Sequence, residues 1–199
     1  AFQVNHDIQI AAYKAFGHLL QDDIELQGHF VDKTLVILLE LLPSKSTSLE
    51  VLQHILHILV IIANAEKYLP VLVENDVHCT AIDLLGKTTL TDGVASECLE
   101  LLHGLLKDSS LSVQEMMVTS GYMETKLGSV LKNFLQSHCV QRAGLKLLNL
   151  LVGPVLQKSL ELGTKTNDIS YNFLNIINAA MYNNREQKDI VILGCDVAS

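Results

Sequence analysis

The segment Gly86-Lys87-Thr88-Thr89 carries the residue types with which proteins hold nucleotide phosphates. In a phosphate-binding P-loop, backbone N–H groups surround the phosphates, and a lysine and a hydroxyl complete the site. That motif requires a glycine five residues before Gly86, on a loop that leaves a strand. This chain has Ala81 there, within a predicted helix. The sequence therefore favours a helix C-cap followed by a polar loop, and a nucleotide-binding enzyme is the less favoured alternative.

Histidines and cysteines form three close groups with the donor atoms of metal ligands: His54 with His57, His78 with Cys79, and His138 with Cys139. His54 and His57 are neighbours on a helix, but no third ligand follows at a spacing typical of zinc sites. The two adjacent pairs point in different directions along their helices. We therefore predict no metal site and no cofactor. The chain also lacks a Gly-x-Ser-x-Gly nucleophile turn, and we predict no catalytic residue and no enzyme activity.

The strongest candidate for a binding surface is one face of a helix towards the C-terminal end of the chain. Tyr171, Asn175, Asn178 and Tyr182 are spaced 4, 3 and 4 residues apart, which places them on one side of a helix. The asparagine amides can hydrogen-bond a peptide backbone, and the tyrosines add flat, amphipathic contact area. The alternative is a polar face that meets only solvent.

The elements that position these residues are long amphipathic helices that open with a recurring signature. Five β-branched anchors begin apolar helical stretches: Ile8, Val51, Val94, Val140 and Ile190. They lie 43, 43, 46 and 50 positions apart. Helical periods of about 40–47 residues indicate a HEAT or armadillo solenoid. Such a protein presents an extended surface rather than a catalytic pocket.

Each repeat is predicted to contain three helical segments. In the first three repeats these segments are 7–20, 24–30 and 32–42; 49–63, 68–73 and 75–85; and 92–106, 113–118 and 123–135. In the fourth, a turn at Gly153-Pro154 separates 138–151 from 155–162, and a third helix spans 168–181. The whole chain, 1–199, is predicted to be one solenoid. Its repeats are approximately 4–47, 48–91, 92–137, 138–183 and a truncated fifth at 184–199, so we expect a fragment of a larger protein.

Composition and charge exclude several classes of protein. The chain is 49% hydrophobic but only 5% aromatic, which suits stacked helices. Its net charge is −8, and Arg142 and Arg185 are its only arginines. Because nucleic-acid binding needs clustered lysine and arginine, we predict no nucleic-acid partner. A basic or neutral protein is the expected partner.

The four cysteines and the apolar runs bear on location. Cys79, Cys98, Cys139 and Cys195 form no C-x-x-C motif, and we predict reduced thiols in the cytoplasm, with Cys98 and Cys195 in core positions. The longest apolar run, 58–63, is too short to span a bilayer, so no membrane insertion is expected.

The amino-acid sequence of the long helices resembles that of the armadillo family over essentially the whole chain. The segments that carry this resemblance are Val140-Gln141-Arg142-Ala143-Gly144-Leu145 and Ile8-Gln9-Ile10-Ala11-Ala12. The resemblance implies an all-α, right-handed superhelical solenoid of three-helix repeats, about four and a half in number. It also implies that the closing helix of each repeat lines a concave groove. The face from Tyr171 to Tyr182 would then lie in that groove, together with Lys132 and Asn133 from the preceding repeat.

One departure from the family pattern narrows the prediction. Armadillo nuclear-import receptors and catenins carry Trp and Asn at fixed places in the helices that open with Val-Gln. Aligned on that anchor, the Trp place holds Lys14, His57, Glu100 and Lys146, and the Asn place holds His18, Ile61, Gly104 and Leu150. A receptor for nuclear-localisation signals is therefore not expected.

The predicted function is a non-catalytic protein–protein interaction scaffold that presents a concave helical groove to a protein segment or domain. The stretches 50–59 and 72–79 also resemble the N-terminal armadillo region of Roco-class leucine-rich-repeat kinases. That resemblance implies an alternative, a regulatory arm that recruits small GTPases or packs on the kinase's own catalytic domains. Uncovered apolar ends of the solenoid predict self-association.

Overall fold

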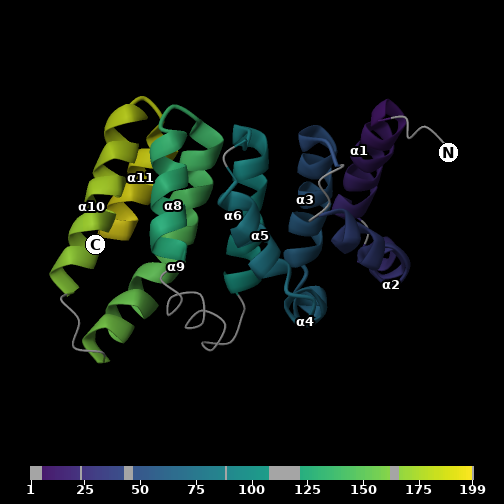
Figure 1. The fold of residues 1–199 in the computed structure, drawn as a ribbon, viewed down its shortest axis with the longest axis horizontal. Coiled ribbons are helices and arrows are strands. Elements are labelled where there is room, and N and C mark those ends of the chain that lie inside the picture. Colours follow the sequence, from purple (N-terminus) through teal and green to yellow (C-terminus); the bar gives the residue numbers. More distant parts are fainter. Residues whose placement is uncertain are drawn as a thin grey trace. The chain divides into compact units, whose positions relative to one another are not determined.

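The computed structural model describes residues 6–22, 24–42, 47–87, 89–107, 122–161 and 166–198. Within these ranges the chain forms ten α-helices and one short 3-10 helix, with no β-strand (Figure 1). This part of the protein is all-α, as the sequence predicts. The helix expected at 113–118 lies outside the described residues.

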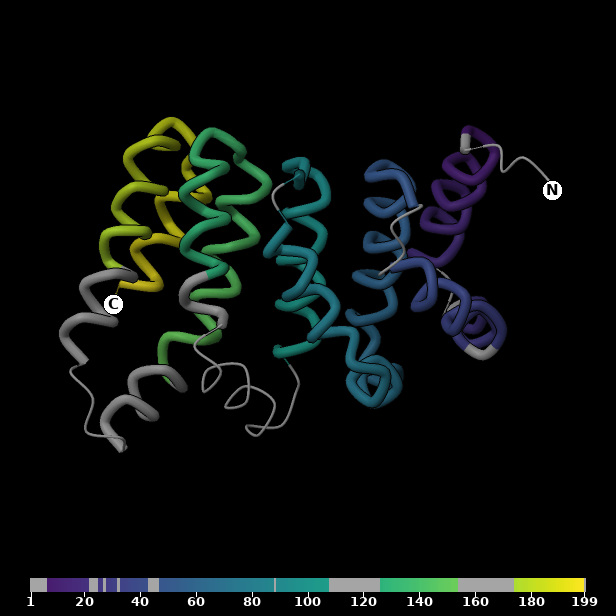
Figure 2. Tube along the Cα trace, in the orientation of Figure 1, coloured from purple at the N-terminus to yellow at the C-terminus, as the bar shows by residue number. Residues whose placement is uncertain are grey.

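By its internal contacts the chain divides into two compact units, Ala1–Leu105 and Leu106–Ser199. The helices of the first unit are α1 (His6–Asp22), α2 (Ile24–Leu41), α3 (Leu49–Ala63), η1 (Glu66–Tyr68), α4 (Leu69–Glu74), α5 (Val77–Leu85) and most of α6 (Asp92–Lys107). Those of the second unit are α8 (Tyr122–Asn133), α9 (His138–Glu161), α10 (Thr166–Asn183) and α11 (Lys188–Ala198). In the second unit α11 packs against both α9 and α10 (Figure 2).

Helix α3 is the centre of the first unit's core. Eight of its fifteen residues are buried, among them Ile55, Leu56 and Ile58. Each such side chain contributes about 1.5–3 kcal/mol when it leaves water. Helix α1 packs along α3, and the two helices open with the anchors Ile8 and Val51. Ser48 begins α3 by accepting a hydrogen bond from the Val51 N–H at 3.3 Å, which satisfies one free donor of the first turn.

Two helices are longer than the sequence predicts. Helix α2 runs without a break through the expected boundary between 30 and 32, since buried Phe30, Val31 and Leu35 continue one apolar stripe. Helix α9 continues through Gly153-Pro154, where we expected a turn. Proline removes one backbone donor from a helix interior, but a helix can continue past that loss. Both predicted breaks are wrong.

The cysteines are free thiols, and the prediction for their burial holds at one of two positions. Cys98 is buried as expected, and burial raises the pKa of its thiol. Cys195 is exposed, which contradicts the expected core position. Helix α11 is buried along Ile190, Gly194 and Val197 instead, so Cys195 lies just beside that stripe.

Among the described helices, none is by itself both long and apolar enough to cross a bilayer. Helix α3 and the segment Glu66–Glu74 reach that length and composition only when taken together, and they are bent by 106°.

Candidate functional site

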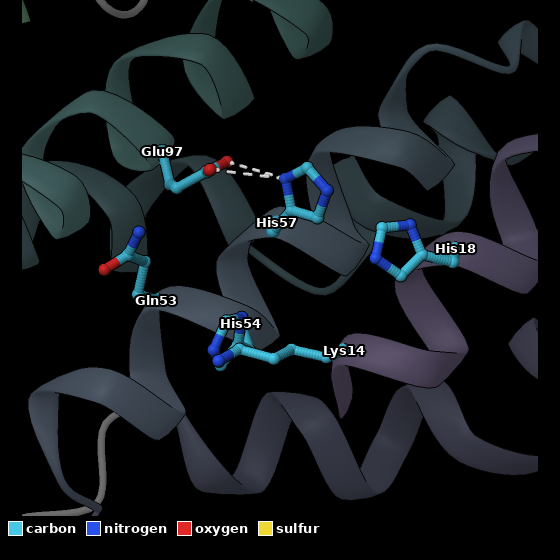
Figure 3. Close-up of a pocket in the computed structure, with 6 residues that line it drawn as sticks. All are labelled: Lys14, His18, Gln53, His54, His57 and Glu97. Atoms are coloured by element: carbon cyan, nitrogen blue, oxygen red, sulfur yellow. Dashed lines mark hydrogen bonds and ion pairs between the residues drawn. The ribbon is translucent and has the colours of Figure 1, made fainter. Parts of the chain in front are cut away.

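A groove of about 300 Å³, lined by polar and charged residues, lies across three helices of the first unit (Figure 3). Its lining residues are Lys14 and His18 from α1, Gln53, His54 and His57 from α3, and Glu97 from α6. Residues four apart share a helix face, which explains why Lys14 lies with His18, and Gln53 with His57. The packing of α1 on α3 brings these two pairs together.

His57 and Glu97 form the ion pair that joins α3 to α6 in this groove. The Nδ1 atom of His57 lies 3.2 Å from one carboxylate oxygen of Glu97 and 3.4 Å from the other. The hydrogen bond to Glu97 raises the pKa of His57, against the opposing effect of partial burial. The pair is 40% exposed at His57 and 22% exposed at Glu97, so solvent reaches it.

His54 has the opposite electrostatic environment. Burial lowers its pKa first, and the positive charge of Lys14 lowers it further. Figure 3 shows the Lys14 side chain extending from α1 towards the His54 ring. The neutral ring of His54 offers both a donor and an acceptor. The groove thus places an ammonium group, an amide, an imidazole and an ion pair around one space.

The residues that the sequence proposed as the binding face lie elsewhere, in the second unit. Asn175, Asn178 and Tyr182 are exposed on α10, with Tyr182 71% exposed, and Lys132 and Asn133 are exposed at the end of α8. Helices α8 and α10 pack together. The side chain of Tyr171 lies outside the described residues. A second cavity, of about 400 Å³, lies in this unit, and none of the five candidates whose side chains are described lines it.

Four of the groove residues stand out in the sequence, although no site is predicted there. Lys14, His18 and His57 hold the places of the armadillo Trp and Asn residues, where the sequence departs from the family pattern. His54 stands out as the helical neighbour of His57. Polar residues at equivalent places in successive helices were the available signal. Gln53 lies four positions before His57 on the same face of α3. Glu97 has no such signal in the sequence, because only its contact with His57 between α6 and α3 brings it to the groove.

The local structure at Gly86 differs from that of a P-loop. Gly86 is the C-cap of α5, as predicted, so a helix rather than a strand leads into the segment. Thr88 lies outside the described residues. Comparison of the chain with protein-family models, curated proteins and solved structures finds no match.

Proposed function

We propose that the protein is a non-catalytic interaction module that binds a segment of a partner protein in the groove of α1, α3 and α6. The observation that carries the proposal is the convergence of polar side chains from three helices on one cavity. Three of them, Lys14, His18 and His57, hold the Trp and Asn places of the armadillo pattern that the sequence resembles. The groove, rather than the exposed face of α10, is therefore the proposed binding site.

The armadillo-like repeat arrangement is part of the same proposal. Two observations support it. Anchor helices of successive predicted repeats pack together, α1 with α3 and α9 with α11. The connections that follow α8 and α10 also have the same backbone hydrogen bonds, fifty positions apart. After α8, Phe134 N–H donates to Val130 and Ser137 N–H donates to Phe134. After α10, Asn184 N–H donates to Ala180 and Gln187 N–H donates to Asn184.

The groove favours an extended segment with one acidic side chain. The Gln53 amide and the His54 imidazole supply hydrogen-bonding groups for a peptide backbone. Lys14 supplies a positive charge for a carboxylate. The net charge of −8 repels strongly acidic chains at long range. The preferred partner segment is therefore neutral or basic overall, with a single carboxylate placed at Lys14.

The proposed function can be tested with peptides selected from a random library displayed on phage. The binding of the enriched peptide is then measured by fluorescence anisotropy. We expect Lys14→Ala combined with Gln53→Ala to weaken binding at least about tenfold. The matched control is Asn175→Ala, Asn178→Ala and Tyr182→Ala together, which should leave the Kd unchanged. Failure to enrich any peptide, or loss of binding in the control variant alone, would reject the groove.

A further inference from the structure

Asp76, His78 and Cys79 bring three different metal-binding donors together at the start of α5, away from the groove. One carboxylate oxygen, one imidazole nitrogen and the thiol sulfur all lie within 4.8 Å of one another. Asp76 takes the left-handed backbone conformation (φ 53°) and is the N-cap residue of the helix. His78 and Cys79 follow in its first turn.

The His78 ring is an independent sign of a missing ligand. The residue is only 2% exposed, and within the part of the chain that the structure describes both ring nitrogens are buried without a hydrogen-bond partner. Buried polar atoms in proteins are nearly always paired, so an unpaired imidazole calls for an explanation. A metal ion would provide a partner for one of these nitrogens. Asp76 and Cys79 are both exposed, so an ion can reach the cluster from solvent.

The local charge favours a cation. A carboxylate oxygen of Asp76 lies within 4.8 Å of both the Cys79 sulfur and a ring nitrogen of His78, so a negative charge stands at the cluster. The N-terminal end of α5 carries about half a positive charge, which opposes a cation, but the full charge of the Asp76 carboxylate exceeds it.

We propose that Asp76, His78 and Cys79 bind a Zn²⁺ ion through one oxygen, one nitrogen and one sulfur, with water as the fourth ligand. This donor mixture suits zinc better than the hard cations, which prefer oxygen alone. Tetrahedral zinc sites separate their ligand atoms by about 3.3–3.8 Å, so small side-chain rotations close the cluster around the ion. The thiol proton leaves to solvent as the sulfur–zinc bond forms, and no electrons are transferred.

This proposal departs from our prediction that the chain has no metal site. Neighbouring residues on a regular helix point about 100° apart, so the pair His78-Cys79 does not by itself predict a site. The ligand atoms lie at the ends of their side chains, however, and those ends converge with the carboxylate of the N-cap residue. Nothing in the sequence pattern indicates that Asp76 completes the set.

Titration of the full chain with Co²⁺, followed by displacement with Zn²⁺, tests the site. We expect one Co²⁺ to bind with a thiolate-to-metal charge-transfer absorption in the near ultraviolet, which Zn²⁺ abolishes. Cys79→Ser should remove that absorption, and Asp76→Asn should weaken binding at least about tenfold. The control is Cys139→Ser, which alters another exposed cysteine that also follows a histidine; it should behave like the wild type.

Thermal unfolding gives a second readout that does not depend on absorption. Zn²⁺ should raise the Tm of the wild type and of Cys139→Ser but not that of Cys79→Ser, since only a folded-state ligand stabilises. These variants alter exposed side chains, so they avoid the folding defect expected from replacing buried His78. Charge-transfer absorption that survives Cys79→Ser, or an equal Tm shift in all variants, would overturn the proposal.

Discussion

At the residue scale, the hydrogen bond between His57 and Glu97 makes the stability of the first unit depend on pH. The pKa of His57 is raised above its ordinary value of 6.5 by this bond. The stabilisation is therefore fully present below pH 6.5 and is lost as pH rises through the folded-state pKa. The lowered pKa of His54 makes the opposite contribution to the pH dependence of stability, because protonation of that ring is less favourable in the folded chain than in the unfolded chain.

Replacement of Glu97 tests the sign of this dependence. Glu97→Gln should destabilise the chain by up to about 1 kcal/mol at about pH 5.5, because the pair is partly exposed, and by less at about pH 8.5. Urea unfolding at the two pH values measures the difference. Glu74→Gln, which alters an exposed carboxylate on α4, is the control and should show no such change. A larger loss at the higher pH would contradict the assignment.

Gln141 gives a second prediction at this scale. Its buried amide nitrogen donates to the carbonyls of Leu131 at 2.8 Å and Phe134 at 3.0 Å, and so ties the end of α8 to α9. Gln141→Ala leaves these carbonyls without that donor and should cost about 1–3 kcal/mol of unfolding free energy. Denaturant unfolding measures this cost. Gln136→Ala, at an exposed glutamine in the same unit, should stay within about 0.5 kcal/mol of wild type.

At the element scale, the close approach of α8 and α9 depends on Gly144. A Cβ atom at this position would contact the side chain of Leu131, which is itself buried. Gly144→Ala should therefore destabilise by about 1–3 kcal/mol, despite the better helix propensity of alanine. Circular dichroism with denaturant measures the change.

Gly153→Ala in the same helix is the matched control. Among the residues that the structure describes, no atom lies within 4 Å of a Cβ atom placed there. Alanine has the better helix propensity, but Pro154 restricts the residue before it, and these two contributions oppose each other. The unfolding free energy of Gly153→Ala should therefore stay within about 0.5 kcal/mol of the wild type. Equal changes in unfolding free energy for Gly144→Ala and Gly153→Ala would show that packing against Leu131 does not determine the cost at Gly144.

The sequence predicts helices best where an apolar stripe and its end signals agree. Helix α3 begins at Leu49 and ends at Ala63 as predicted, and α6 begins at Asp92 as predicted. The prediction fails where a break was inferred from one local residue, as at Pro154, because an element's packing can outweigh one lost hydrogen bond. The groove could not be located in advance, since Glu97 reaches His57 only through the packing of α6 beside α3.

At the scale of the whole molecule, exposed apolar side chains predict self-association. On α1 and α2, Leu19, Val36 and Ile37 are each more than half exposed. Where exposed apolar side chains lie together, they often contact another protein surface. Light scattering across a concentration series should show a mass that rises with concentration. Replacement of these three residues by lysine should restore a constant monomer mass, and a wild type that stays monomeric throughout would contradict the prediction.

The central claim is that one groove, formed by α1, α3 and α6, recognises a partner segment. Chemical-shift mapping by NMR with the library-selected peptide tests it most directly. We predict that the largest changes fall on the amides and imidazoles of Lys14, His18, Gln53, His54 and His57, while Asn175, Asn178 and Tyr182 remain unchanged. Changes confined to α10, with the groove signals unmoved, would contradict the account.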